Sequence, residues 1–147
     1  MKHRIFLGLL IVIFSTCSKN STSSNQPKYA GNWEGTTSDN RPMSFHVNGD
    51  DEMDTMSVEI RVNFGSFRET RTFRNMDVVS IENDTFSVNL SSPMIFFVSG
   101  KRPVVHAEFT DGKTSNGTIS SFVVTRGNAM MGTPKTNSSQ TWTAELF

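Results

Sequence analysis

The chain contains one cysteine, no excess of either charge and no clear helical periodicity. Because Cys17 is the only thiol in the sequence, no disulfide forms within the chain. Lysine and arginine together number 14, and so do aspartate and glutamate. This balance lacks the basic excess that is typical of nucleic-acid-binding domains, so we expect no nucleic-acid partner.

Long hydrophobic runs are also lacking. The apolar stretch 5–14 has ten residues, whereas a membrane-spanning helix needs about 20 and a signal-peptide core fits roughly 10–14. The basic start Met1–Arg4 precedes this stretch and small residues follow it. Residues 1–16 are therefore predicted to be a secretory signal peptide.

The segment Phe14-Ser15-Thr16-Cys17 resembles the lipobox of bacterial lipoproteins, in which an apolar residue and two small residues precede a cysteine. The resemblance implies that a lipid is attached to the Cys17 sulfur and that the signal is cut just before it. Ser18, rather than an aspartate, follows the cysteine, which implies the outer membrane rather than the inner one. The expected location is the bacterial cell envelope, with the membrane contacted through the lipid. The alternative is an ordinary secretory signal with an incidental cysteine.

Residues 17–28 are predicted to form a flexible tether. After Cys17 the chain reads SKNSTSSNQPK, a composition too polar to build a core. Eleven such residues span roughly 18–20 Å on average. Residues 29–147 are then expected to form one monomeric domain, large enough to fold without disulfides. Removal of Lys2 and Arg4 with the signal leaves 12 basic and 14 acidic residues, a net charge of −2.

Apolar and polar residues alternate along most of this domain. Even positions are apolar and odd positions polar through 56–63, the pattern of a half-buried strand. The same pattern predicts inward side chains at Phe86, Val88, Leu90, Val105, Ala107, Phe109, Trp142, Ala144 and Leu146. Turn residues such as Asn48-Gly49-Asp50 and Asp111-Gly112 separate the runs. We therefore predict an all-β fold: an antiparallel sandwich or small closed barrel of about nine or ten strands joined by up-and-down hairpins.

Two tryptophans mark the two ends of the domain. Trp33 lies in the first predicted strand and Trp142 in the last. Pairing of these strands would close the sheet, remove an exposed edge and bring both rings into the core. Two independent core residues are the alternative.

The opening segment, Gly31 to Val47, resembles that of a loose group of small secreted bacterial β-domains that begin Gly-x-Trp-x-Gly-Thr-Thr. Gly117-Thr118-Ile119 and Trp142-Thr143-Ala144 stand where such domains close. Gly31-Asn32-Trp33 also resembles the first strand of lipocalin-like barrels, which hold apolar ligands. That second resemblance implies that Trp33 packs in the barrel floor.

No metal site is expected, either in the acidic run near Asp50 or at the histidines. Asp50, Glu52 and Asp54 have the spacing of a calcium loop, but Thr55 replaces the required glycine and Arg61 the required glutamate. A solvated hairpin turn fits this run better. His46, His106 and Glu108 do not supply a complete set of zinc ligands. No cofactor is expected either.

A stripe of arginines is the best candidate for binding. Arg68 and Arg74 share one face of a predicted strand, with Phe67 and Phe73 flanking the stripe. Arginines bind carboxylates or sulfates of a glycan by bidentate contacts. Pairing of the arginines with Glu59 and Glu69 across strands is the bland alternative. Charge on both faces of this strand suggests an edge or rim position, where a protein partner adds a strand or the charges prevent such addition.

No nucleophile motif or phosphate loop is present, so we expect no catalysis. The sequence favours a lipid-anchored envelope protein whose β-domain binds a glycan or a protein partner. The alternatives are a lipocalin-like carrier of a small apolar ligand and a structural subunit of an envelope complex. Asp54-Thr55-Met56 also matches an O-glycosylation sequence of some bacteria, and modification of Thr55 is left open.

The anchor can be tested by metabolic labelling with a clickable fatty acid. We expect the wild-type protein to carry the label and Cys17→Ala to lose it. A label that persists in Cys17→Ala would show that the lipid is attached to another residue.

Overall fold

The computed structural model describes residues 27–147, apart from 65–67, 76, 94, 98–100 and 127–134. Cys17, the signal peptide and most of the tether lie outside the described residues, as does Phe67. The described part is all-β and contains no helix that is long and apolar enough to cross a membrane.

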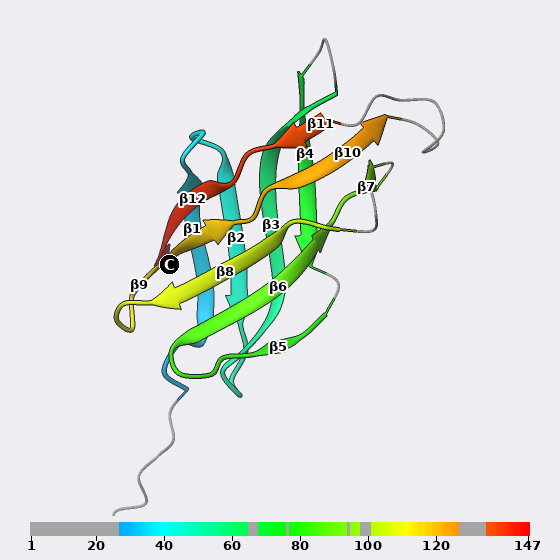
Figure 1. The fold of residues 1–147 in the computed structure, drawn as a ribbon. Coiled ribbons are helices and arrows are strands. Elements are labelled where there is room, and N and C mark those ends of the chain that lie inside the picture. Colours follow the sequence, from blue (N-terminus) through cyan, green and yellow to red (C-terminus); the bar gives the residue numbers. More distant parts are fainter. Residues whose placement is uncertain (1–26, 65–67, 76, 94, 98–100, 127–134) are drawn as a thin grey trace, which may run out of the picture.

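Eight strands form a closed antiparallel barrel (Figure 1). They are β1 (Gly31–Thr37), β2 (Pro42–Val47), β3 (Glu52–Asn63), β4 (Arg68–Asn75), β6 (Thr85–Ser91), β8 (Val104–Phe109), β9 (Thr114–Ile119) and β12 (Gln140–Leu146). Each pairs with the barrel strand before and after it in the chain, and β1 pairs with β12 to complete the circle. The up-and-down order is therefore confirmed, and the choice between sandwich and barrel is decided for the barrel.

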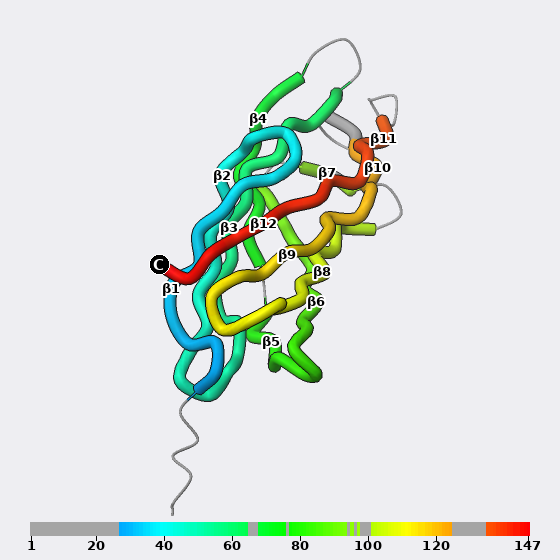
Figure 2. Tube along the Cα trace, turned by 90° about the vertical axis from the view of Figure 1, so that its left-hand side faces the viewer, coloured from blue at the N-terminus to red at the C-terminus, as the bar shows by residue number. Residues whose placement is uncertain are grey.

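Four short strands lie outside the barrel order. β5 (Val79–Ser80) adds to the edge of β3. β7 (Ile95–Phe97), β10 (Phe122–Arg126) and β11 (Lys135–Asn137) form a separate three-stranded sheet. In that sheet β10 continues β9, and β11 leads into β12 (Figure 2). The sequence underestimated the number of strands because these four have only two to five residues each.

The alternation of burial follows the predicted pattern. In β3 the apolar residues Met56, Val58, Ile60 and Val62 are buried. The other inward positions predicted on β6, β8 and β12 are also buried, except Leu146, which packs partly buried against the core. Because strand residues alternate between faces, one register places these apolar side chains inside the barrel.

Both tryptophans are core residues, as predicted. Trp33 and Trp142 are fully or almost fully buried. The ring of Trp33 stacks on Phe45 at 5.4 Å between centroids, and Trp142 meets Phe45 edge-on at 6.0 Å. The indole N–H of Trp33 donates to the Tyr29 carbonyl at 2.9 Å. Phe45 thus joins the two rings across the closing strands.

Small inward residues make space for these rings. Gly117 lies opposite Trp142 on one side and Ala107 on the other. A Cβ at Gly117 would stand 1.9 Å from the His106 carbonyl oxygen and 2.8 Å from the Trp142 ring. The absence of a side chain therefore allows β8, β9 and the Trp142 ring to pack closely.

A second aromatic cluster lies beyond the main barrel core. Phe73 contacts Phe97 and Phe122 with centroid distances of 6.3 and 5.6 Å. Phe97 and Phe122 belong to the three-stranded sheet, which therefore packs against Phe73 on the inner face of β4. Aromatic rings therefore pack both in the main barrel core and beyond it.

Gly117→Ala tests the close packing at β9. We expect a loss of about 1–3 kcal/mol in unfolding free energy, because overpacking forces backbone and ring to move. Gly49→Ala is the matched control, since a Cβ there meets nothing within 4 Å, and it should change stability by less than about 0.5 kcal/mol. Equal denaturant midpoints for the two variants would contradict this account.

Candidate functional site

The arginine stripe lies on the outside of the barrel. Arg68 and Arg74 are exposed on β4, and their spacing along the strand is roughly 20 Å at about 3.3 Å per residue. Phe73 is completely buried, which corrects the expectation that it flanks an exposed binding face. Among the described residues, Phe147 is the large aromatic side chain that is exposed. It is far from this stripe in the sequence.

The expected pairing of the stripe with Glu59 and Glu69 is wrong. Glu69 instead pairs with Arg71, at 2.8 Å between Glu69 Oε1 and Arg71 Nη2, on the opposite face of β4. Within the described part of the chain, Arg61, Arg68 and Arg74 form no ion pair and no side-chain hydrogen bond. These three guanidinium groups are therefore available to an external anion.

β4 has an edge character over most of its length. It pairs with β3 from Arg68 to Arg74, but its register with β6 is limited to Arg74 and Asn75. One further link is the Ser92 hydroxyl, which donates to the Thr72 carbonyl at 2.6 Å. In the described structure β4 therefore lies between β3 and β6, with only a short pairing to β6.

Arg61 and Arg68 meet in one polar groove, here called the far-end groove. Arg61 lies opposite Thr70, and Arg68 lies opposite Asn63, so the two arginines are diagonal neighbours on the outer face of β3 and β4. Such neighbours have Cβ atoms roughly 7–8 Å apart. The groove has a volume of about 250 Å³ and is lined by Ser38, Asp39, Arg61, Asn63, Arg68, Asn137, Ser138, Ser139 and Gln140.

Hydrogen bonds hold the other side of the far-end groove. The Asn63 backbone N–H donates to Asn137 Oδ1 at 2.8 Å, which ties β11 to β3. Gln140 Nε2 donates to Asp39 Oδ2 at 3.0 Å. The remaining amide atom, Gln140 Oε1, is buried without a hydrogen-bond partner among the described residues. An unpaired buried acceptor costs free energy unless a ligand or water supplies a donor.

Arg74 belongs to different grooves. It lines two shallow depressions on the outer face of β1, β2 and β3. In one of them His46 Nδ1 lies 2.9 Å from Asp54 Oδ1. The structure therefore does not bring Arg68 and Arg74 together, although both lie on the same face of one strand.

A serine–histidine contact lies on the outside of β6 and β8. Ser87 Oγ and His106 Nδ1 are 2.8 Å apart, and both residues are exposed. β8 is paired with β6 on one edge and β9 on the other, so its backbone N–H groups are engaged in the sheet. The contact therefore links the outer faces of two paired strands.

No metal-binding cluster of three or more histidine, cysteine or acidic side chains occurs among the described residues. The acidic run of the β2–β3 turn does not converge on one point. Glu52 Oε2 accepts from Asn48 Nδ2 at 3.2 Å, whereas Asp54 contacts His46. These carboxylates stabilise the turn and its flanking strands.

The chain enters the barrel through a clamp made by two aspartates. Asp51 accepts from the backbone N–H groups of Lys28 and Tyr29, each at 3.0 Å. Asp84 Oδ1 accepts from Lys28 Nζ at 2.8 Å and from the Tyr29 hydroxyl at 2.5 Å. The Tyr29 ring also stacks on Phe109 at 4.0 Å. These contacts fix the point where the predicted tether joins the domain.

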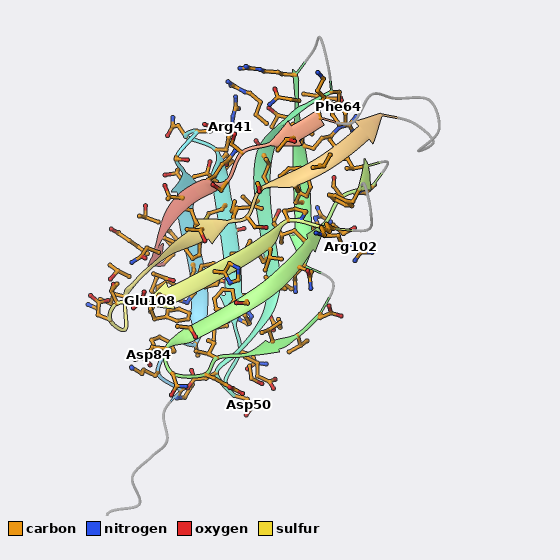
Figure 3. The ribbon with its side chains drawn as sticks, viewed as in Figure 1. Arg41, Asp50, Phe64, Asp84, Arg102 and Glu108 are labelled. Carbon is orange, nitrogen blue, oxygen red and sulfur yellow. The ribbon has the colours of Figure 1, made fainter. Side chains whose placement is uncertain are left out.

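Because the barrel is up-and-down, its turns alternate between two ends. The entry end contains the clamp and the β2–β3, β5–β6 and β8–β9 turns. The far end contains the β1–β2 turn, the β3–β4 hairpin and the three-stranded sheet. Figure 3 shows Asp50 and Asp84 at the entry end and Arg41 and Phe64 at the far end.

Charge is separated between these ends although the whole chain is neutral. Acidic residues outnumber Lys28 and Lys113 at the entry end, where they are Asp50, Asp51, Glu52, Asp77, Glu82, Asp84 and Asp111. Basic residues outnumber Asp39 and Glu69 at the far end, where they are Arg41, Arg61, Arg68, Arg71 and Lys135. The far end therefore presents a positive field to solvent.

Sequence reasoning found the arginines but missed the partners that make a groove with them. Asn63 and Asn137 are 74 residues apart in the chain, and Asp39 and Gln140 are 101 apart. No local motif marks such residues. Only the closure of β12 against β1 brings them to the same end of the barrel.

Comparison with known proteins identifies no relative: no family model, curated protein or solved structure matches this chain. The resemblances to bacterial lipoproteins and lipocalin-like barrels therefore remain predictions from the sequence. Function has to be inferred from the geometry and charge of the domain itself.

The clamp predicts a pH-dependent stability. Hydrogen bonds from Lys28 and then Tyr29 lower the pKa of Asp84 from its ordinary value of 3.8. A carboxyl group with a lowered pKa stabilises the fold above its unfolded pKa, and the effect is lost as the pH falls through the folded pKa. We therefore expect wild type to be more stable than Asp84→Asn at pH 7, with the difference shrinking as the pH falls below 3.8 toward the lowered pKa of the folded state.

Thermal unfolding of both variants between pH 2 and pH 8 measures this difference. Asp77→Asn, on the same end but outside the clamp, is the control. A wild-type advantage over Asp84→Asn that stays constant down to pH 2 would contradict a role for the ionised carboxylate.

Proposed function

We propose that this chain is a lipid-anchored protein of the bacterial cell envelope whose barrel binds an anionic partner at its far end. The observation that supports it most directly is the separation of charge, because the basic end lies opposite the clamp that receives the tether. Lipid on Cys17 would anchor the entry end, and Ser18 favours the outer membrane.

The dimensions suit this arrangement. The predicted tether of residues 18–28 spans roughly 18–20 Å. β3 has 12 residues and at about 3.3 Å per residue extends roughly 40 Å toward the far end. An upright barrel would hold its basic end well away from its own membrane, beyond the Debye length of about 8 Å at physiological salt.

The unpaired arginines support a glycan or protein partner that carries negative charge. Arg61 and Arg68 have no carboxylate partner within the described structure, so binding an external anion requires no ion pair to be broken. Arginine recognises carboxylate and sulfate groups by bidentate hydrogen bonds. The proposed role is binding without catalysis.

The packed interior gives less support to the alternative of an apolar ligand carrier. Trp33, Phe45 and Trp142 contact one another through Phe45 in the middle of the barrel, and Phe73 fills the space toward the far end with Phe97 and Phe122. Ligand pockets of typical size, about 300–1,000 Å³, need space that these rings occupy.

Binding to a polyanionic glycan tests the proposed function. The full-length protein, purified in detergent, should be retained on immobilised heparin at low salt and released as the salt is raised. The double variant Arg61→Ala and Arg68→Ala should weaken retention at least about tenfold, because two charged hydrogen-bond donors are lost. Arg74→Ala is the matched control and should leave retention nearly unchanged.

A protein that is not retained at low salt would contradict an anion-binding role. Equal loss of retention in Arg74→Ala and in the double variant would show that the far end is not the binding surface.

A further inference from the structure

We propose that the far-end groove binds one carboxylated sugar residue, with its carboxylate on Arg61 and Arg68 and its hydroxyl groups on Asp39 and Gln140. This inference rests on the proposed function and names the chemistry that the basic end would recognise. The groove combines two free cations with acceptor atoms on its other side.

The carboxylate end of the site is set by strand register. Arg61 and Arg68 are diagonal neighbours on one face of paired strands and both line the groove. Their Cβ atoms are separated by roughly 7–8 Å, a span that two long side chains can close around a single carboxylate. Both are free of other ion pairs among the described residues.

The acceptor end of the site distinguishes a sugar from a simple anion. Gln140 Oε1 is buried without a donor among the described residues, and Asp39 uses one carboxylate oxygen to hold Gln140 Nε2. Both residues offer acceptors, which a sugar hydroxyl satisfies by donating. Acetate has no hydroxyl group to donate, so it would leave Gln140 Oε1 unpaired.

The size of the groove limits the ligand. Its volume of about 250 Å³ lies below the range of about 300–1,000 Å³ for pockets that enclose drug-sized ligands. Ser138 and Ser139 line the same groove with further hydroxyl groups. One acidic sugar unit of a longer glycan fits these limits, with the rest of the polymer outside the groove.

Ligand-observed NMR with the full-length protein in detergent tests the inference. Galacturonate is the probe, galactose supplies the hydroxyl groups without the charge, and acetate supplies the charge without the hydroxyl groups. We expect galacturonate to bind more tightly than either control, with a preference over acetate of about two- to tenfold for each hydroxyl accepted. Arg68→Ala should weaken galacturonate and acetate together, whereas Arg74→Ala should change neither.

Gln140→Leu separates the acceptor end from the arginines. It should weaken galacturonate binding by about two- to tenfold, the contribution of the one hydroxyl that Gln140 accepts, and leave acetate binding unchanged. Asp39→Asn, in the exposed β1–β2 turn, provides a second variant in case Gln140→Leu fails to fold. It should reduce the preference for galacturonate over acetate, because an amide oxygen is a weaker acceptor of a sugar hydroxyl than a carboxylate.

Each outcome decides between the two proposals. Equal binding of galacturonate and acetate, or an unchanged preference in the folded Gln140→Leu or Asp39→Asn variant, overturns the sugar site. Retention on heparin without galacturonate binding overturns the sugar site but leaves the anion-binding function standing. Failure of the wild type to be retained on heparin overturns the anion-binding function itself, whatever the monosaccharides do.

Discussion

Pairing of β1 with β12 is the contact on which the rest of this structure depends. It closes the sheet from Trp33↔Leu146 to Thr37↔Trp142 and brings two distant tryptophans to the same central phenylalanine. Because β1 and β12 pair with each other, neither the first nor the last barrel strand is left as a free edge. It also requires small residues at the inward positions beside the rings, which Gly117, Ala107 and Ala144 supply.

Closure of the barrel separates acidic from basic residues in a chain whose formal net charge is zero. Up-and-down connections place alternate turns at opposite ends, and the acidic turns share the end where the chain enters. Asp51 and Asp84 accept hydrogen bonds from Lys28 and Tyr29 there. They also contribute to the negative field. Arg61 and Arg68 lie at the other end because they flank the hairpin between β3 and β4.

Two residues show how strand parity and neighbouring elements divide the candidate site. Phe73 and Arg74 are adjacent in the chain, yet one fills the second aromatic cluster and the other lies on the surface. Arg71, on the same parity as Phe73, is half-exposed and paired with Glu69, because the inner face of β4 opens toward the far end. A stripe that looks uniform in the sequence therefore splits into a core residue, an ion pair and free guanidinium groups.

The sequence by itself determined the strand class and the inward residues, and it favoured the pairing of the first strand with the last. These features depend on period-two alternation and turn chemistry, which are local, and on two tryptophans that must both be buried. Only the tertiary structure decided that the sheet closes as eight strands with a small second sheet beyond it. It also decided that Arg61 and Arg68 share a groove with Asp39 and Gln140 while Arg74 does not. The physical reason is that a groove depends on register across closed strands, and register joins residues about 100 positions apart that no local pattern relates.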